Sequence, residues 1–238
     1  MGRPSKGNLT DHVATSLGRS IVSGEYAAGS VFQINELCST FDASRTVMRE
    51  AVKALTAKGL VTSRASVGSI VQKEENWNLS DSDVLDWFLH VKGNTVPLIR
   101  EFMEFRLAIE PMAAMLAAER GDKVAIDKIY LALDRMKAAK NGEDDPLSAD
   151  IEFHVAILHA SGNRFYVNMR HTVDVALNIS IRVTNRSKGV AGASVADHAK
   201  IADAIRAGDG EAAKAAMQNL IMEAQQLLRG KVPALEDI

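Results

Sequence analysis

The sequence predicts a mostly α-helical protein with two domains, the first made of helices followed by a β-hairpin and the second an all-α antiparallel helical bundle. The chain has 238 residues, which is enough for two hydrophobic cores. Aromatic residues make up only 5% of it and alanine is abundant after residue 100, a composition that favours helices over strands. Residues 1–73 carry 9 Lys or Arg and 5 Asp or Glu, whereas residues 74–238 carry 19 and 25. The two parts therefore differ in the sign of their charge.

Residues 1–76 predict three helices and a hairpin. Apolar residues recur at helical spacing, and glycines or short polar segments separate the elements. Asn35 is the expected N-cap of the second helix and Ser44 that of the third. The expected elements are helices at 9–23, 34–41 and 44–58 and strands at 60–63 and 69–72. This order is typical of a winged helix-turn-helix DNA-binding domain.

The third expected helix has an apolar face and a basic face. Apolar residues from Val47 to Leu55 point inward, while Arg45, Thr46 and Arg49 lie near the start of the helix on the other side. A recognition helix contacts base edges through its N-terminal residues, and arginine suits the two acceptors of guanine. A solvated helix face would carry the same charges, but the hairpin that follows favours DNA binding. The expected DNA-binding residues are Asn35, Ser44, Arg45, Thr46, Arg49, Arg64 and Gly68.

Residues 77–95 are predicted to form a linker with one short amphipathic helix around Trp87, and residues 96–232 to form the helical domain. Glycines fall at or near the breaks in helical periodicity after residue 120. The expected helices are 96–119, 122–140, 146–160, 164–186, 195–207 and 210–229. Short loops between successive helices favour an antiparallel bundle.

Two groups of polar residues interrupt apolar helix faces in this domain. Asp150 and His154 are four residues apart on one face, and His198 begins an apolar stripe on a later helix. Three such donors from two helices can hold a divalent metal, although a surface pair or a core histidine gives the same pattern. Arg106 lies on another apolar stripe, where Glu110 and a bound carboxylate can pair with it. An exposed Arg106–Glu110 salt bridge is the alternative.

The stretch from Leu17 to Val71 resembles the GntR family of transcriptional regulators. The matching segments are Ile21–Tyr26, Gly29–Ser30, Asn35–Leu37, Ser44–Ala51, Lys58–Val61 and Val67–Val71. The resemblance implies an operator-binding winged helix-turn-helix. The family usually has an arginine where this chain has Asn35, so its operator sequence does not carry over.

Residues from about Leu98 to Leu228 resemble the FCD ligand-binding domain of the FadR-type branch of that family. The matching segments are Glu104–Arg106 with Glu110, Asp150–His154, Gly162–Asn163, His198 with Ala204–Ile205, and Gly208–Asp209 leading to Ala215–Met217. The resemblance implies that Asp150, His154 and His198 ligate a divalent metal (Zn, Mn or Ni), and that Arg106 and Asn163 bind the effector. The position of the family's usual fourth ligand is Leu220, so water or effector oxygens would complete the coordination shell.

The segment from Trp77 to Trp87, together with the missing fourth ligand, is similar to repressors of galactonate and related sugar-acid catabolism. This likeness implies a hydroxylated carboxylate as the effector, with a galactonate-like aldonate as the leading example. Arg106 suits the carboxylate, and a metal or polar pair suits a 2-hydroxyl. Arg182 and Asn185 on a later helix are the expected partners of further hydroxyls, although a solvated polar face would look the same.

These features together predict a homodimeric repressor that binds operator DNA and is released by an organic-acid effector. An activator of the same architecture is one alternative. A metal-dependent enzyme that acts on a carboxylate is another, but no nucleophile or base accompanies the three candidate ligands, so we expect no enzyme. The single cysteine, Cys38, permits no internal disulfide, and no apolar run reaches the roughly 20 residues that span a bilayer. We therefore expect a cytoplasmic protein without membrane contact.

Overall fold

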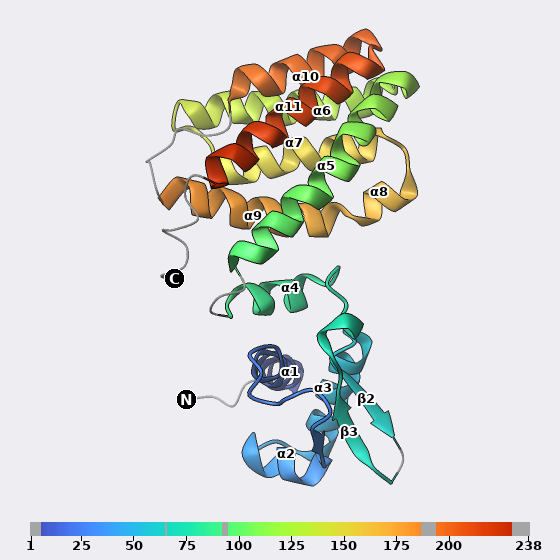
Figure 1. Cartoon of the computed structure of the whole chain (residues 1–238), viewed down its shortest axis with the longest axis vertical. Helices are drawn as coiled ribbons and strands as arrows, with labels where there is room; N and C mark the ends of the chain where they lie inside the picture. The colour runs from blue at the N-terminus through green and yellow to red at the C-terminus, as the bar shows by residue number, and fades with distance from the viewer. Residues whose placement is uncertain (1–5, 65, 92–94, 187–193, 230–238) are drawn as a thin grey trace. The chain divides into compact units, whose positions relative to one another are not determined.

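The computed structural model describes residues 6–64, 66–91, 95–186 and 194–229, with the backbone alone at 6–8, 95, 179–186 and 228–229. This part of the chain is mostly helical with one small β-sheet, as the sequence predicts (Figure 1). It divides into two compact units, Met1–Asn94 and Thr95–Ile238. None of the described helices is both long and apolar enough to cross a membrane.

The first unit has the element order of a winged helix-turn-helix. Its elements are α1 (Lys6–Val22), β1 (Val31–Phe32), α2 (Ile34–Thr40), α3 (Arg45–Ala57), β2 (Val61–Arg64), β3 (Gly68–Val71), a 3₁₀ turn at Glu74–Asn76, and α4 (Ser82–Leu89). The three strands pair antiparallel in the order β1-β3-β2. The strand β1 was not predicted, because two residues show no periodicity. This strand exists only through its pairing with β3, in which Val31 lies opposite Ile70 and Phe32 opposite Ser69.

The core of the first unit lies between α1, α3 and the sheet. Leu17, Met48, Leu55 and Leu60 are fully buried there. Buried residues recur at helical spacing on both helices, so each helix buries one face and leaves the other exposed; they are Val13, Leu17 and Ile21 on α1 and Met48, Val52 and Leu55 on α3. The packing of α1 on α3 therefore fixes which residues of α3 remain at the surface.

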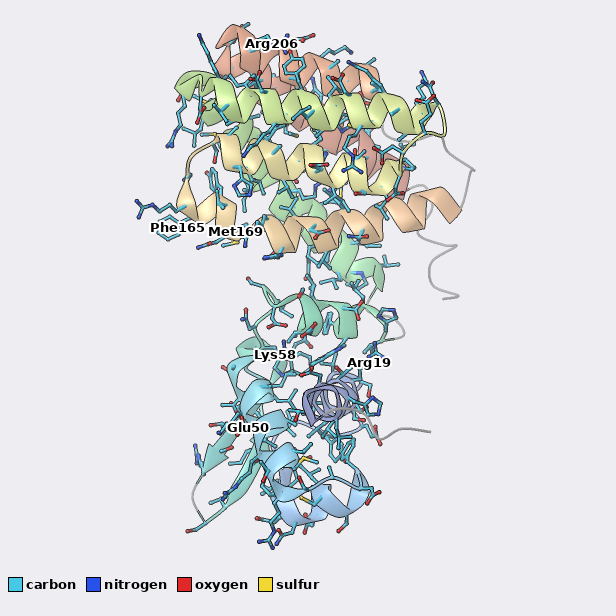
Figure 2. The ribbon with its side chains drawn as sticks, turned by 180° about the vertical axis from the view of Figure 1, so that it is seen from behind. Arg19, Glu50, Lys58, Phe165, Met169 and Arg206 are labelled. Atoms are coloured by element: carbon cyan, nitrogen blue, oxygen red, sulfur yellow. The ribbon has the colours of Figure 1, made fainter. Side chains whose placement is uncertain are left out.

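The short helix α4 packs against α1 within the first unit. Its Trp87 is 4% exposed, and the ring lies so close to Gly18 that a Cβ there would be 2.2 Å from a ring carbon. Asp81 caps α4 by accepting hydrogen bonds from the amides of Asp83 and Val84. Lys58, labelled in Figure 2, lies at the C-terminal end of α3. Its Nζ pairs with Asp81 and with Asp83 at 2.7 Å each. These ion pairs connect the end of α3 to the start of α4, in addition to the packing of α4 on α1.

The second unit is a helical bundle. Its helices are α5 (Thr95–Arg120), α6 (Lys123–Lys140), α7 (Pro146–Ala160), α8 (Arg164–Asn168), α9 (Arg170–Arg186), α10 (Val195–Ala207) and α11 (Gly210–Arg229). Helix α5 packs on α7, α9, α10 and α11, and α6 packs on α7 and α10 (Figure 1). The centre is filled by small and aliphatic side chains, with Phe153, Ile157, Leu158 and Ile129 fully buried.

The single helix expected at 164–186 is divided into α8 and α9 at Met169. The amide of Met169 donates to the carbonyl of Tyr166, three residues earlier, which tightens the last turn. The Arg170 guanidinium donates to the carbonyl of Val167 at 3.0 Å. Helical periodicity alone did not reveal the break, because the interruption is a single residue between two helices.

Candidate functional site

The basic face of α3 is exposed. Arg45, Thr46 and Arg49 lie on the surface near the N-terminus of the helix, whereas Val47 and Met48 are buried. Neither arginine has an ion-pair partner among the described residues, so both guanidinium groups can reach an external acceptor. The sequence placed these side chains correctly because helical periodicity separates a buried face from an exposed one.

Ser44 begins α3 by accepting a hydrogen bond from the amide of Val47 at 3.3 Å, as predicted. Its hydroxyl proton stays available to a phosphate. Asn35 is exposed on α2, but the expectation that it caps this helix was wrong: the N-cap is Gln33. The Gln33 amide donates to the Val67 carbonyl at 2.7 Å, so this residue also fastens the start of α2 to the hairpin.

The hairpin of β2 and β3 carries the two remaining expected DNA-binding residues. Arg64 is exposed at the end of β2 and lies opposite Gly68 in the ladder. Gly68 has a φ of 116°, and a Cβ there would lie 2.8 Å from the Phe32 carbonyl oxygen. A glycine is therefore required for the backbone of the hairpin, which is a structural role that does not depend on DNA.

Five ionisable side chains converge inside the second unit, and we call them the buried polar cluster. They are at most 5% exposed and comprise Arg106 and Glu110 on α5, Asp150 and His154 on α7, and His198 on α10. Asp150, His154 and His198 each offer one ligand atom, and these atoms lie within 4.8 Å of one another. The five residues of this cluster come from three separate helices, and the fold of the second unit brings them together.

Arg106 and Glu110 form a buried ion pair rather than an exposed one. Arg106 Nε donates to Glu110 Oε1 at 2.6 Å, and Glu110 Oε2 lies 2.5 Å from Nδ1 of His154. Burial alone would raise the pKa of Glu110, but Arg106 and His154 outweigh it and lower the pKa to about 2. Glu110 is therefore ionised and accepts from both neighbours. The sequence had assigned it to Arg106 only, because its contact with His154 crosses 44 residues.

The second half of the cluster pairs Asp150 with His198. Burial would raise the pKa of Asp150, but His198, His154 and Arg106 lower it, so the carboxyl is also ionised. His198 Nδ1 lies 3.0 Å from the Ser194 carbonyl oxygen, which can only accept, so this nitrogen carries a proton. His198 Nε2 lies 3.0 Å from Asp150 Oδ1, yet neither atom meets hydrogen-bond geometry with any partner among the described residues.

This arrangement fits a divalent cation. Asp150 Oδ1 and His198 Nε2 are buried and lie 3.0 Å apart without a hydrogen bond between them. Two ligands of one metal, with bonds of about 2.1 Å, lie about 3.0 Å apart at right angles and about 3.4 Å apart in a tetrahedral site, so this separation is compatible with a shared cation. Imidazole nitrogen and carboxylate oxygen suit Zn and Mn. Leu220, at the position of the expected fourth ligand, is half-buried and packs against the apolar core, so it contributes no ligand atom.

The other expected effector-binding residues are not part of the buried polar cluster as described. Asn163 is the N-cap of α8 and accepts a hydrogen bond from the amide of Phe165 at 3.0 Å. Arg182 and Asn185 lie on α9, but their side chains are outside the described residues. Thr172 near the start of α9 is buried, and its hydroxyl has no hydrogen-bond partner in the described part of the chain.

The two units match two protein families. Residues 9–71 match the bacterial regulatory proteins of the gntR family, and residues 101–223 match the FCD domain. Since the second match alone covers more than half of the chain, the protein belongs to the GntR family of transcriptional regulators, in the branch with an FCD domain. These families and their relatives are regulators rather than enzymes, as the sequence predicts.

Among its relatives, the chain is similar to the galactonate operon transcriptional repressor of Escherichia coli, with 31% identity over 93% of this chain and 97% of that protein. It is also similar to the uncharacterized regulator YieP of the same organism, with 33% identity over 90% of this chain and 93% of YieP. The solved structure of Lar, which controls the expression of the Listeria monocytogenes agr system, superposes with a TM-score of 0.63, 19% identity and coverage of 96% of this chain and 99% of Lar. At that identity, the likeness to Lar supports the fold alone.

Proposed function

We propose that this regulator is a cytoplasmic, homodimeric repressor of a sugar-acid catabolic operon, released from its operator when a hydroxylated carboxylate binds the second unit. The observation that carries the proposal is the buried polar cluster, in which Arg106 lies among ionisable groups inside an apolar bundle. The relative named as a galactonate operon repressor supports an aldonate as the effector. Symmetric dimers on pseudo-palindromic operators are the common arrangement for such domains.

Arg106 is the proposed anchor for the effector carboxylate. Its described hydrogen bonds use Nε and Nη2, so Nη1 can donate to an added acceptor. Glu110 already pairs with Arg106, and Asp150, His154 and His198 lie in the same cluster. An acid that binds at Arg106 therefore meets polar partners that the fold has already placed. A buried guanidinium that binds a carboxylate gains a charge-assisted hydrogen bond in a medium of low polarity.

Asp150, His154 and His198 are the proposed holders of a divalent cation. The support is the donor chemistry of the three side chains and the two buried atoms without hydrogen-bond partners among the described residues, Asp150 Oδ1 and His198 Nε2. A cation there would supply a Lewis-acidic partner for effector oxygens. Arg106 on α5 selects for an acid. The packing of α5, α7 and α10 fixes the positions of Arg106, Asp150, His154 and His198.

DNA binding is proposed for the exposed basic face of α3 and for the hairpin. In this proposal Arg45 and Arg49 contact base edges, while Ser44, Thr46 and Arg64 contact phosphates; the exposure of these five residues supports it. Asn35 and Gly68 would lie beside them, with Gly68 shaping the hairpin.

Titration calorimetry with D-galactonate tests the effector proposal. The wild-type protein should bind the acid, galactitol should not bind because it lacks the carboxylate, and Arg106→Met should lose binding by at least tenfold. Arg100→Ala is the matched control, because Arg100 is an exposed arginine on the same helix. Equal affinity of the wild-type protein and Arg106→Met for every acid that binds would show that the anchor is misassigned.

A mobility-shift assay with the DNA upstream of the protein's own gene tests the repressor proposal. The protein should shift this DNA, and an acid that binds in calorimetry should weaken the complex by roughly 5- to 150-fold. A protein that never shifts this DNA would contradict the operator assignment. An acid that strengthens the complex would contradict release by the effector.

A further inference from the structure

The two histidines of the buried polar cluster are held in the same way by groups outside the candidate ligand set. His198 Nδ1 faces the carbonyl oxygen of Ser194, and His154 Nδ1 faces Oε2 of Glu110. Both facing atoms are acceptors by geometry: one is a backbone carbonyl oxygen, and the other is an oxygen of the carboxyl group that already accepts from Arg106 Nε. Each Nδ1 is therefore placed to donate a hydrogen bond, which leaves Nε2 as the nitrogen of each ring that can bind a metal.

Arg106 contacts the His154 ring as well as Glu110. Arg106 Nη2 lies 3.5 Å from Nδ1 and 3.4 Å from Nε2 of this histidine. Arg106 is thus a common neighbour of Glu110 and His154.

We infer that Glu110 is a positioning residue that holds His154 as an Nε2 metal ligand and links this histidine to the effector anchor Arg106. One oxygen of its carboxylate accepts from Arg106 Nε and the other from His154 Nδ1. Metal-ligating histidines commonly donate their second N–H to such a carboxylate, which fixes the ring and raises its basicity. This inference rests on the proposed function, since it assigns Glu110 a task in the same site.

The exchange Glu110→Gln tests the inference without changing the size of the side chain. A carboxylate has two accepting oxygens, whereas a carboxamide has one, so the exchanged side chain can satisfy Arg106 Nε or His154 Nδ1 but not both. Glu104→Gln is the matched control, because Glu104 lies on the same helix and is exposed. Circular dichroism shows that each variant is folded before any further measurement.

The first readout is the tautomer of His154 by ¹⁵N NMR in full-length protein without metal and without acid. The wild type and Glu104→Gln should show a single species protonated at Nδ1, and Glu110→Gln should show a mixture or the Nε2-protonated form. A wild-type His154 protonated at Nε2, or the same Nδ1 signal in Glu110→Gln, overturns the inference. This readout is independent of the proposed function, which fails separately if wild-type protein binds neither metal nor acid.

The second readout is Zn²⁺ affinity by competition with a chromophoric chelator. Glu110→Gln should weaken binding by about 10- to 100-fold, the usual effect of losing such a carboxylate. Arg106→Met then completes a double-mutant cycle. In the Arg106→Met background the single oxygen of the carboxamide is free to accept from His154. There Glu110→Gln should weaken Zn²⁺ binding by less than about tenfold. An unchanged Zn²⁺ affinity in Glu110→Gln, or the same loss in both backgrounds, overturns the link between the two residues.

Discussion

At the scale of single residues, this protein uses exposed and buried arginines for different proposed contacts. Arg49 is exposed on α3 with no ion-pair partner among the described residues, whereas Arg106 is 4% exposed and paired with Glu110. An exposed guanidinium keeps its hydration and its freedom to reach an external partner. A buried one must have its partners supplied by the fold, because an unpaired charge in an apolar core is very costly.

Arg49→Ala should remove specific DNA binding and leave acid binding intact. A bidentate contact from arginine to guanine discriminates by about 1–3 kcal/mol, so operator affinity should fall roughly 5- to 150-fold. Mobility shifts with operator and with scrambled DNA measure the change. Lys123→Ala is the control, because Lys123 is an exposed basic residue of the second unit. A variant that still prefers operator over scrambled DNA by the wild-type ratio would count against a base-reading role.

Arg64→Ala should behave differently, because its proposed partner is a phosphate. Binding to operator and to scrambled DNA should weaken by similar factors. The slope of log affinity against log salt concentration should become shallower by about 1, since one fewer counterion is released. Fluorescence anisotropy at several salt concentrations measures this slope. An unchanged slope would place Arg64 away from the DNA backbone.

At the scale of elements, α4 is part of the first unit because Trp87 packs on α1. The backbone of α1 can accept the ring only at a residue without a side chain, and that residue is Gly18. Lys58 adds to the contact, since it pairs with Asp81 and Asp83 and lies 5.7 Å from the Trp87 ring centroid. Burial would lower the pKa of Lys58, but the two carboxylates prevail and raise it.

Gly18→Ala should destabilise the first unit, although alanine is the better helix former. Helix propensity alone predicts a gain of about 1 kcal/mol. A new Cβ at 2.2 Å from the Trp87 ring forces a rearrangement that costs about 1–3 kcal/mol instead. Urea denaturation followed by circular dichroism gives the free energy of unfolding.

The matching experiment repeats Gly18→Ala in a Trp87→Leu background. The smaller side chain removes the clash, so the same exchange should become neutral or stabilising there. The two effects are then strongly non-additive, as expected for residues in contact. Additive effects, or a stabilising Gly18→Ala in the wild-type background, would mean that Trp87 does not lie against α1 in solution.

At the scale of the whole molecule, the division into two compact units predicts two separable unfolding transitions. A proposed effector bound only by the second unit should raise the melting temperature of one transition and leave the other in place. At an acid concentration of about 100 times Kd, this stabilisation is about 2.7 kcal/mol. Differential scanning calorimetry with and without the acid measures it, with Arg106→Met as control. A shift of both transitions by equal amounts would contradict confinement of the acid to the second unit.

The sequence by itself determined the fold class, the positions of most helices and the exposure of the basic face of α3. These features follow from hydrophobic periodicity, caps and glycine breaks, which are local properties of the chain. The spacing of Asp150 and His154 and of Arg106 and Glu110 likewise placed each pair on one helix face. The family resemblance added the expectation that Asp150, His154 and His198 share one metal site and that Arg106 binds the effector.

Only the tertiary structure decided how distant residues combine. It brought Glu110 to His154 across 44 residues, added β1 to the sheet by pairing with β3, and placed Trp87 on Gly18. It also divided the helix expected at 164–186 into α8 and α9 at Met169. Periodicity states which face of a helix is buried but not which helix covers it, because that choice depends on the packing of the whole bundle.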